Sequence, residues 1–350
     1  MPRVTVAGAG IAGLAVGSFL ARAGFEVDIR ERSEAPSADG AGIQLSPNAC
    51  HVLHALGILD AVRAVAVAPS AVELQDGDRP LSRFELGERI ERSGGAPYLV
   101  CARAGLRDAL LDALPAAAAV SYGSPFAATD GIVIGADGVG SVVRDLVPGA
   151  ARPVDTGWTA WRRTTEAASG DTTRVLLSPD EHRVAYPLRS SLNEVWVRRS
   201  DCPAPGADWT PWPVLAVDPD GSWSHGSTVL IGDAAHAMPP YAAQGGAMAL
   251  EDAAELAAAL TASPDDPPAA FLRYEKARRP RIEAVACLTR ANRRIYHLAG
   301  PMRHARNVAM RLAPQAVLQR RMAWVYGWKP PAGLEPGRAA DLRSTSEPSR

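Results

Sequence analysis

Three glycines and one acidic residue form the first pattern that could do chemistry. Gly8, Gly10 and Gly13 lie between an apolar strand and an apolar helix, and Glu31 ends the strand that follows. In such a βαβ unit the first glycine allows a tight turn, the second lets the backbone approach a pyrophosphate, and the third lets helix and strand pack closely. The carboxylate can accept hydrogen bonds from a ribose hydroxyl. The combination predicts a site for FAD or NAD, whereas the glycines alone would also fit a plain turn.

A second pattern follows an apolar strand late in the chain. The strand ends at Asp233, and Gly245 and Gly246 precede a helix expected over 247–260. Asp233 could bind a ribityl hydroxyl, and a helix N-terminus aimed at a flavin ring would stabilise the negative charge of the reduced flavin. On spacing alone, Asp233 could instead cap a helix while the two glycines belong to a loop.

The elements that must position these residues follow from the periodicity of the apolar positions. Strands are expected at 3–8, 25–30, 132–134 and 228–232, and helices at 11–23, 47–59, 103–114 and 247–260. Alternating residues around a turn at 76–78 predict strands within 72–100. The segment 151–230 holds six of the eight tryptophans and β-like pieces at 183–188 and 194–198. We therefore expect an α/β nucleotide-binding domain with a second, sheet-based region inserted within it.

Composition sets the limits of this interpretation. The chain has 350 residues, of which 47% are hydrophobic and 21% charged, so it can bury a large core in about two domains. Its four cysteines are far apart in the sequence and form no CxxC motif, which argues against a disulfide framework and a cysteine zinc site. The uncharged run at 4–21 superficially suggests a signal peptide or membrane span, but its glycines favour a buried βαβ unit. A reducing cytoplasm is the expected setting, without membrane association.

The basic residues are almost all arginines and gather near the C-terminus. Of 37 basic residues only Lys276 and Lys329 are lysines, so Schiff-base chemistry would be confined to two late positions. Residues 271–329 hold 14 basic and 2 acidic residues in a chain of net charge −1. The helical spacing lacks interleaved aromatic residues and argues against nucleic acid. We predict a solvated helical face that offsets the acidic remainder and attracts anionic NAD(P)H or an aromatic acid.

In five ordered stretches the chain resembles the FAD-dependent aromatic hydroxylases, the class A flavoprotein monooxygenases of the para-hydroxybenzoate hydroxylase type. The likeness is strongest to the salicylate hydroxylase-like branch. The stretches are 8–13 with Glu31-Arg32, 41–49, the helix opened by Arg103, 135–138 with Ser141 and Arg144, and 232–236 with Pro239 and 244–246. They span residues 1–260, and each is far less specific alone than in this order.

The resemblance implies a glutathione-reductase type, Rossmann-like FAD-binding domain, an inserted mixed β-sheet substrate region and a C-terminal helical tail. FAD would be tightly bound, and the implied cofactor-binding residues are Gly8, Gly10, Ala12, Gly13, Glu31, Arg32, Gly42, Arg103, Asp137, Asp233, Gly245, Gly246 and Ala247. The implied FAD-binding segments are 1–71, 101–150 and 226–300, and the substrate segments are 72–100 and 151–225. Helices at 301–335 and a disordered tail at 336–350 complete the chain.

The implied reaction is hydroxylation of a small aromatic compound, anionic or phenolic, with NADH or NADPH and molecular oxygen, through a flavin C4a-hydroperoxide. By resemblance, Arg162 lies on a strand facing substrate or flavin, and Tyr186 lies on the next. Arg162 could pair with a carboxylate or phenolate, and His182 or Tyr186 could help deprotonate a phenol. The structural alternatives are a surface ion pair for Arg162, an exposed turn for His182 and a core position for Tyr186.

Several alternatives stay open beside this interpretation. A flavin-dependent halogenase would need an N-terminal lysine, which this chain lacks, and a plain NAD-dependent dehydrogenase would leave the stretch 232–246 unexplained. The segments 114–132 and 186–229 are short for the family, so a truncated homologue that acts as an uncoupled NAD(P)H oxidase, or does not turn over, is the second function. His51, His54 and His236 are expected to be structural, with no metal site. The oligomeric state is expected to be monomer or homodimer.

Overall fold

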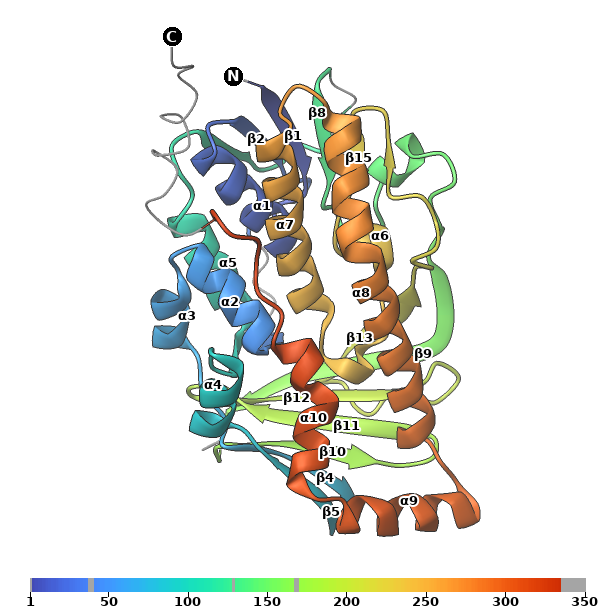
Figure 1. The fold of residues 1–350 in the computed structure, drawn as a ribbon. Coiled ribbons are helices and arrows are strands. Elements are labelled where there is room, and N and C mark those ends of the chain that lie inside the picture. Colours follow the sequence, from blue (N-terminus) through green and yellow to red (C-terminus); the bar gives the residue numbers. More distant parts are fainter. Residues whose placement is uncertain (1, 37–40, 128–129, 167–169, 335–350) are drawn as a thin grey trace.

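A computed structural model describes residues 2–36, 41–127, 130–166 and 170–334 (Figure 1). Six strands form one sheet in the order β14-β15-β8-β1-β2-β7. They are β1 (Arg3–Ala7), β2 (Glu26–Arg30), β7 (Ala118–Ser121), β8 (Ile132–Gly135), β14 (Ser224–His225) and β15 (Thr228–Leu230). The strands from β15 to β7 run parallel, and β14 is antiparallel to β15. Buried valines and isoleucines fill β1, β2 and β8, as expected for a parallel sheet covered on both faces.

Helices pack on this sheet and against one another. They are α1 (Ile11–Arg22), α5 (Arg103–Asp112), α7 (Gly245–Ala262) and α8 (Pro267–Tyr296), with the short α6 (Asp233–His236), η1 (Val143–Leu146) and η2 (Pro240–Ala242). Helix α1 contacts both α5 and α7, and α7 contacts α8. Buried alanines along α7 let these helices approach closely. The α/β nucleotide-binding domain expected from the sequence is confirmed.

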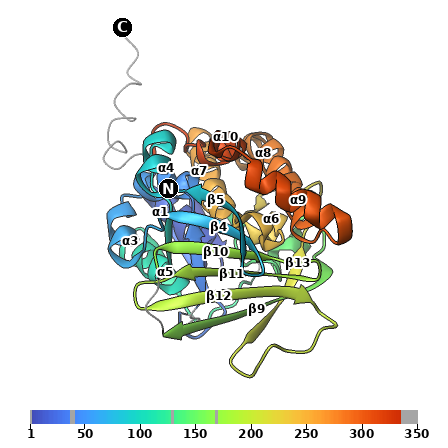
Figure 2. The ribbon, with the colours of Figure 1, turned by 90° about the horizontal axis from the view of Figure 1, so that it is seen from below.

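Seven strands form the second sheet, seen from below in Figure 2, in the order β13-β9-β12-β11-β10-β4-β5. They are β4 (Ala71–Asp76), β5 (Arg79–Glu85), β9 (Val154–Glu166), β10 (Thr172–Leu177), β11 (Glu181–Pro187), β12 (Ser191–Arg199) and β13 (Thr210–Ala216). All neighbours are antiparallel except β4 and β10, so the expected mixed sheet is confirmed. Strands β4 and β5, far away in sequence from the others, extend it at one edge.

A small antiparallel pair joins the two sheets. It consists of β3 (Gly42–Leu45) and β6 (Leu99–Ala102), beside α2 (Pro47–Ala55), α3 (Leu59–Val65) and α4 (Gly87–Gly94). The prediction of one helix over 47–59 was wrong: α2 ends at Ala55, and Gly57 has a φ of +69°, which turns the chain before α3. Helix α4 was also missed, because the strand pattern within 72–100 was extended past the end of β5.

The chain closes with α9 (Gly300–Leu312) and α10 (Gln315–Tyr326), which both contact β5 at the edge of the second sheet (Figure 2). Arg303 of α9 donates through Nε to Asp76 at the end of β4, 2.9 Å away. The Arg303 guanidinium lowers the pKa of this buried carboxyl to about 2. The helical tail expected at 301–335 is thus an integral wall of the molecule. The tail at 336–350, expected to be disordered, lies outside the described residues.

The arginine-rich helices are not the uniformly solvated face that the sequence predicted. Arg278 of α8 is 0% exposed and donates to Glu251 at 2.6 Å and to Asp252 at 2.7 Å, both on α7 and both fully buried. Arg281 donates to Glu251 as well, at 2.5 Å. The prediction failed because the acidic partners lie on a different helix, beyond the reach of local periodicity. Within the described ranges, every helix is too short or too polar to cross a lipid bilayer.

Replacing Arg278 with methionine should lower the free energy of unfolding by about 3–5 kcal/mol, because two buried carboxylates lose their counter-charge. Urea unfolding followed by circular dichroism measures the effect. The matched control is Arg273→Met on the same helix: Arg273 is exposed and bonded to Ser263, so that variant should lose about 1 kcal/mol or less. Equal losses in the two variants would contradict the assignment.

Candidate functional site

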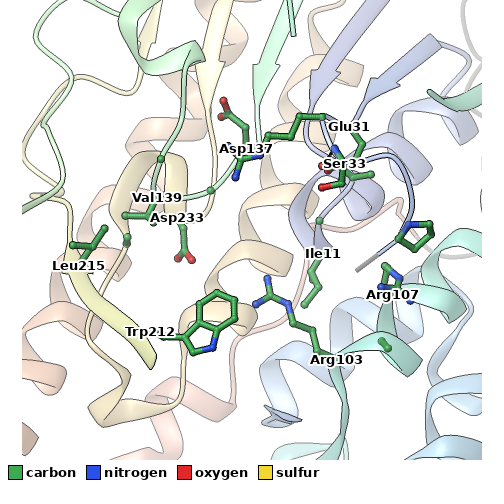
Figure 3. Close-up of a pocket in the computed structure, with 18 of the residues that line it drawn as sticks. Ile11, Glu31, Ser33, Arg103, Arg107, Asp137, Val139, Trp212, Leu215 and Asp233 are labelled. Atoms are coloured by element: carbon green, nitrogen blue, oxygen red, sulfur yellow. Dashed lines mark hydrogen bonds between the residues drawn. The ribbon is translucent and has the colours of Figure 1, made fainter. Parts of the chain in front are cut away.

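A continuous groove runs between the two sheets and has two sections. The outer section has a volume of about 480 Å³ and the inner one about 280 Å³. Gly10, Arg103, Arg162 and Asp233 line both sections, so the two are parts of one groove. Figure 3 shows Glu31 and Ser33 at one end of the outer section, with Arg103 facing Trp212 and Asp233 across it. The groove begins where β1 and β2 end, at the carboxyl edge of the parallel sheet.

The three N-terminal glycines each meet a different constraint. Gly8 has a φ of +100°, and a Cβ there would lie 2.6 Å from the backbone oxygen of Ala136. A Cβ on Gly13 would lie 1.9 Å from the backbone oxygen of Gly8, so α1 could not pack on the turn. A Cβ on Gly10 would meet no protein atom within 4 Å. Gly10 therefore keeps open a space that the protein itself does not fill, as a dinucleotide approaching the backbone requires.

Glu31 is held at the end of β2 by two backbone amides. Ala9 donates to its Oε2 at 2.9 Å and Ser33 to its Oε1 at 2.9 Å. Burial alone would raise the pKa of Glu31, but these amide donors lower it overall, so the carboxylate is charged. Glu31 and Arg32 both line the outer section, and the bonds to Ala9 and Ser33 leave carboxylate lone pairs that can accept from a ribose hydroxyl.

Asp137 and Asp233 follow shortly after β8 and β15, and both line the outer section of the groove. Asp137 accepts from the amide of Val142 at 2.8 Å and thereby holds the turn that follows it. Asp233 lines both sections of the groove and begins α6. Before it, Gly232 has a φ of +59° and donates to Asp252 at 2.8 Å, so α7 fixes where Asp233 lies.

The inner section is formed by glycine-containing segments of β3 and α7. Ala12, Gly42, Gly245 and Gly246 line it together with Gln44 and Gln244. Among the cofactor residues named from the sequence, Gly8, Gly13 and Ala247 do not line either section. The first two shape the turn behind the groove, and Ala247 is fully buried one position past the glycine pair. The sequence indicated Gln244 only as part of the stretch 244–246. Its side chain accepts from Asn48 at 3.1 Å and donates to Ser46 at 3.0 Å, which fixes its position.

The three candidate catalytic residues converge on the inner section. Arg162 on β9, and His182 and Tyr186 on β11, all line it. Tyr186 is buried against Gly42, and a Cβ added at Gly42 would lie 2.5 Å from the tyrosine ring. Burial raises the pKa of the Tyr186 hydroxyl. The alternative of an exposed turn for His182 was wrong, because its side chain points inward from β11 and is 1% exposed. Burial, and then the neighbouring His297, lower the pKa of His182 to about 3.

Trp212 is a wall residue that the sequence did not single out. It lies on β13 between two prolines, is 38% exposed and lines the outer section. The guanidinium of Arg162 lies 5.1 Å from the centre of its ring, within the range of a cation–π contact. Its position follows from the pairing of β13 with β9, in which Trp212 stands opposite Ala160. This pairing joins residues about fifty positions apart, which explains why no local pattern indicated it.

The groove fits a flavin dinucleotide on its own evidence. It combines an open approach at Gly10, a helix N-terminus without a side-chain cap, a charged carboxylate for a ribose and a second carboxylate at Asp233. Comparison with known proteins agrees. Residues 1–122 and 215–289 match the family model described as an FAD binding domain.

The chain is 35% identical to the 3-amino-4-hydroxybenzoate 2-monooxygenase PtmB3 of Streptomyces platensis, over 94% of this chain and 96% of that protein. It is 31% identical to the 3-hydroxybenzoate 6-hydroxylase of Klebsiella oxytoca, over 95% of this chain and 98% of that protein. The first alignment runs over 386 positions, more than the 350 residues here, so this chain carries deletions relative to that protein. These relatives support hydroxylation rather than the uncoupled alternative.

Among solved structures, the fold is similar to Klebsiella pneumoniae HpxO complexed with FAD and uric acid. The TM-score is 0.82 at 20% identity, covering 93% of this chain and 96% of that one. At this level of identity the likeness concerns the fold alone.

Replacing Gly10 with alanine should leave folding intact but weaken FAD binding about tenfold or more, because the added methyl group enters the open approach. Flavin fluorescence titration measures the affinity, and thermal unfolding without FAD measures the fold. Gly13→Ala is the contrasting variant: its methyl group overlaps the backbone of Gly8, so the fold itself should be destabilised. An unchanged FAD affinity in Gly10→Ala would contradict the assigned approach.

Proposed function

The chain belongs to the FAD-dependent class A aromatic monooxygenases, and from that premise we propose that its substrate is a small phenol carrying a carboxylate. As a member, it is an oxidoreductase that uses FAD, NAD(P)H and molecular oxygen to hydroxylate a small aromatic compound. The observation that carries the proposal is that a cation, Arg162, and a neutral imidazole, His182, line the same 280 Å³ inner section. The hydroxybenzoates named for the two relatives have both a carboxylate and a phenol.

For the cofactor, we assign Glu31 and Arg32 to the adenosine ribose, Gly10 and Arg103 to the pyrophosphate, and Asp233 to the ribityl chain. Ala12, Gly42, Gly245 and Gly246 would face the flavin end, Asp137 would hold the floor, and Gly8, Gly13 and Ala247 would shape the cleft from behind. Bound FAD would take a hydride from NAD(P)H and activate molecular oxygen for transfer to the substrate. The supporting observation is the section that each group lines. The residues assigned to the adenosine ribose line only the outer section, those assigned to the pyrophosphate and the ribityl chain line both, and those assigned to the flavin end line only the inner section.

Arg162 is proposed to bind the substrate carboxylate. Its guanidinium lies 5.1 Å from the centre of the Trp212 ring, and it lines the inner section together with Val184, Val195 and Val197. An ion pair with a guanidinium gains strength where apolar walls exclude water, because the local dielectric constant falls. The aromatic ring of the substrate would then lie against the valines, with its hydroxyl toward β11.

His182 is proposed to accept the phenol proton, and Tyr186 to donate a hydrogen bond. At a pKa of about 3 the His182 imidazole is neutral at ordinary pH, so a ring nitrogen is free to accept. The raised pKa of Tyr186 keeps its hydroxyl protonated, which makes it a donor rather than a base. A deprotonated phenol is the more electron-rich ring, and electron-rich rings accept an electrophilic oxygen more readily.

We propose that the FAD-binding segments 1–71, 101–150 and 226–300 surround the substrate segments 72–100 and 151–225. Strand membership supports this division in outline, since β4, β5 and β9 to β13 share one sheet. A cytoplasmic location is supported by four free cysteines. We propose a monomer or homodimer that binds no nucleic acid or membrane, and light scattering of the purified holoenzyme measures its mass.

The proposed function predicts that 3-hydroxybenzoate or 3-amino-4-hydroxybenzoate stimulates NAD(P)H oxidation by the FAD-loaded enzyme and yields a hydroxylated product. Mass spectrometry detects the product, and a peroxide assay run in parallel measures uncoupling. Peroxide without product across a panel of aromatic acids and phenols would sink the proposal.

Arg162→Met should raise KM for a carboxylated phenol about tenfold to a hundredfold, the equivalent of one charge-assisted hydrogen bond. KM for the matching phenol without a carboxylate should change little, and this substrate is the internal control. Steady-state kinetics with both compounds decide the point. Equal effects on the two substrates would assign Arg162 to the cofactor instead.

His182→Gln should lower kcat for a phenol about 10²- to 10⁴-fold, the usual contribution of an acid–base group. Because the pKa of His182 is lowered to about 3, the wild-type kcat/KM profile should show no inflection from this residue between pH 5 and pH 8. His51→Gln is the control, since His51 lies outside the groove with its Nε2 2.7 Å from the backbone oxygen of Gly94. A small effect of His182→Gln would exclude the proposed role.

A further inference from the structure

Gln44 is a polar residue of the inner section to which the proposed function gives no role. It lies in β3, is half-buried and lines the same cavity as Val184 and Tyr186. Its Oε1 accepts from the hydroxyl of Tyr98 at 2.8 Å. No described residue accepts a hydrogen bond from its Nε2, so the N–H groups on that atom can serve a ligand in the cavity.

Tyr98 fixes which end of the Gln44 amide faces the cavity. This tyrosine precedes β6 and is 6% exposed, and Gln44 is the hydrogen-bond partner of its hydroxyl among the described residues. Burial raises the pKa of Tyr98 well above its usual value, so the hydroxyl keeps its hydrogen. If the amide were turned around, this buried hydrogen would face N–H groups and lose its acceptor, which is costly. The oxygen of Gln44 therefore stays at Tyr98, and the nitrogen stays toward the cavity.

The C-terminal helices hold Tyr98 in turn. Its ring packs edge-on against Tyr326 at the end of α10, with the ring centres 6.2 Å apart and the planes at 67°. Tyr98 also belongs to an apolar cluster that includes Leu86, Ile90 and Tyr186. A ring packed on several sides has little freedom to rotate, so Gln44 meets a donor in a fixed place.

Gln44 and Arg162 stand at opposite ends of the inner section. Arg162 on β9, Val195 on β12 and Val184 on β11 lie directly opposite one another on three successive strands. Tyr98, the partner of Gln44, belongs to the cluster on the β11 side of this row, against which strands β4 and β5 also pack. An aromatic ring that lies on the two valines with its carboxylate at Arg162 therefore turns its far edge toward Gln44.

We propose that Gln44 is a specificity-determining residue: its side-chain amide donates a hydrogen bond to an oxygen on the ring edge opposite the carboxylate, and so selects a hydroxyl over an amino group there. The inference rests on the proposed function, because it requires a carboxylated ring in the inner section. Tyr98 acts through Gln44 and is a positioning residue.

The chemistry of the two ring substituents explains the selection. A phenol oxygen can accept from Gln44 while its own hydrogen goes to His182. An aromatic amino group is a poor acceptor, because its lone pair is shared with the ring. It can still donate to His182, but it leaves the N–H groups of Gln44 without a partner, and unpaired donors in a water-poor cavity weaken binding.

The test compares two probes on the FAD-loaded protein. The probes 3-hydroxybenzoate and 3-aminobenzoate share the ring and the carboxylate and differ in one group, and the change in flavin absorbance reports the binding of each. The ratio of the two dissociation constants cancels any loss that affects both probes. The wild-type protein should bind 3-hydroxybenzoate at least about threefold more tightly, the equivalent of one neutral hydrogen bond.

Two variants assign this preference to the amide and to its orientation. Gln44→Met keeps most of the side-chain volume but removes the N–H groups, so the preference should fall about threefold or more. Tyr98→Phe leaves Gln44 in place and frees its amide to turn, so the preference should fall in the same direction. In the double variant the fall should be no larger than in Gln44→Met, because both changes act through one hydrogen bond. A merely structural role would weaken both probes alike.

Tyr274→Phe is the matched control. Tyr274 is a buried tyrosine of α8 that lines neither section of the groove, and its hydroxyl donates to the backbone oxygen of Leu230 at 3.4 Å. Removing this hydroxyl should leave the ratio at the wild-type value. Flavin content and the thermal midpoint are measured for every variant. If Gln44→Met does not hold FAD, the ratio in Tyr98→Phe decides the inference.

The outcomes separate this inference from the proposed function. Arg162→Met should weaken both probes and keep their ratio, since both carry the carboxylate. A wild-type ratio of one, or a ratio that stays at the wild-type value in Gln44→Met and Tyr98→Phe, would overturn selection by Gln44, while the effect of Arg162→Met left the proposed function standing. Wild-type protein that binds neither probe would contradict the proposed function and this inference together.

Discussion

The buried ion cluster between α7 and α8 is the interaction on which the groove depends. Arg278 neutralises Glu251 and Asp252, and each carboxylate in turn holds a loop of the groove. Asp252 accepts from the amide of Gly232 at 2.8 Å and contacts His236 at 2.5 Å, which fixes the turn at Asp233. Glu251 accepts from the side-chain amide of Asn48 at 2.7 Å, and the same amide donates to Gln244. The loops at Asn48 and Gly232 are thus both bonded to carboxylates that Arg278 neutralises. Moving either loop away would leave a buried carboxylate with fewer partners, which is costly.

The junction between the two sheets is set by close packing around one glycine. Gly42 of β3 lies against the ring of Tyr186 and donates to the side chain of Asn193 on β12, 2.8 Å away. Because a side chain at position 42 would overlap the tyrosine ring, this contact sets how near the cofactor loops approach the substrate sheet. Gly42 and Tyr186 both line the inner section, so this contact shapes its wall. The segment between α5 and β8 is short: among its described residues, β7 is the single strand.

The two sections of the groove differ in the charged groups that line them. The outer section, where the cofactor is assigned, combines the charged Glu31 with arginines at 32, 103 and 107. The inner section places Arg103 and Arg162 beside valines, a neutral imidazole and a protonated tyrosine. Burial suppresses charge on His182 and Tyr186 alike, because water no longer solvates the ionised forms. The C-terminal helices complete this arrangement by supplying both the counter-charge Arg278 and the imidazole of His297.

The sequence by itself determined the fold class, the FAD-binding family and the glycines and acids of the nucleotide turns, because these depend on local spacing of a few residues. It also indicated Arg162, His182 and Tyr186, whose roles remain proposals. It could not show that Trp212 forms a wall, since the pairing of β13 with β9 joins positions about fifty residues apart. Nor could it show that His182 is buried, since Tyr241, Tyr296 and His297, which pack on its ring, come from distant segments. The break at Gly57 and helix α4 were missed where short elements carry weak periodicity. The arginine-rich tail was taken as solvated because its partners Glu251, Asp252 and Asp76 lie on other elements. Only tertiary packing brings such charges together, and it alone decides which of them are buried.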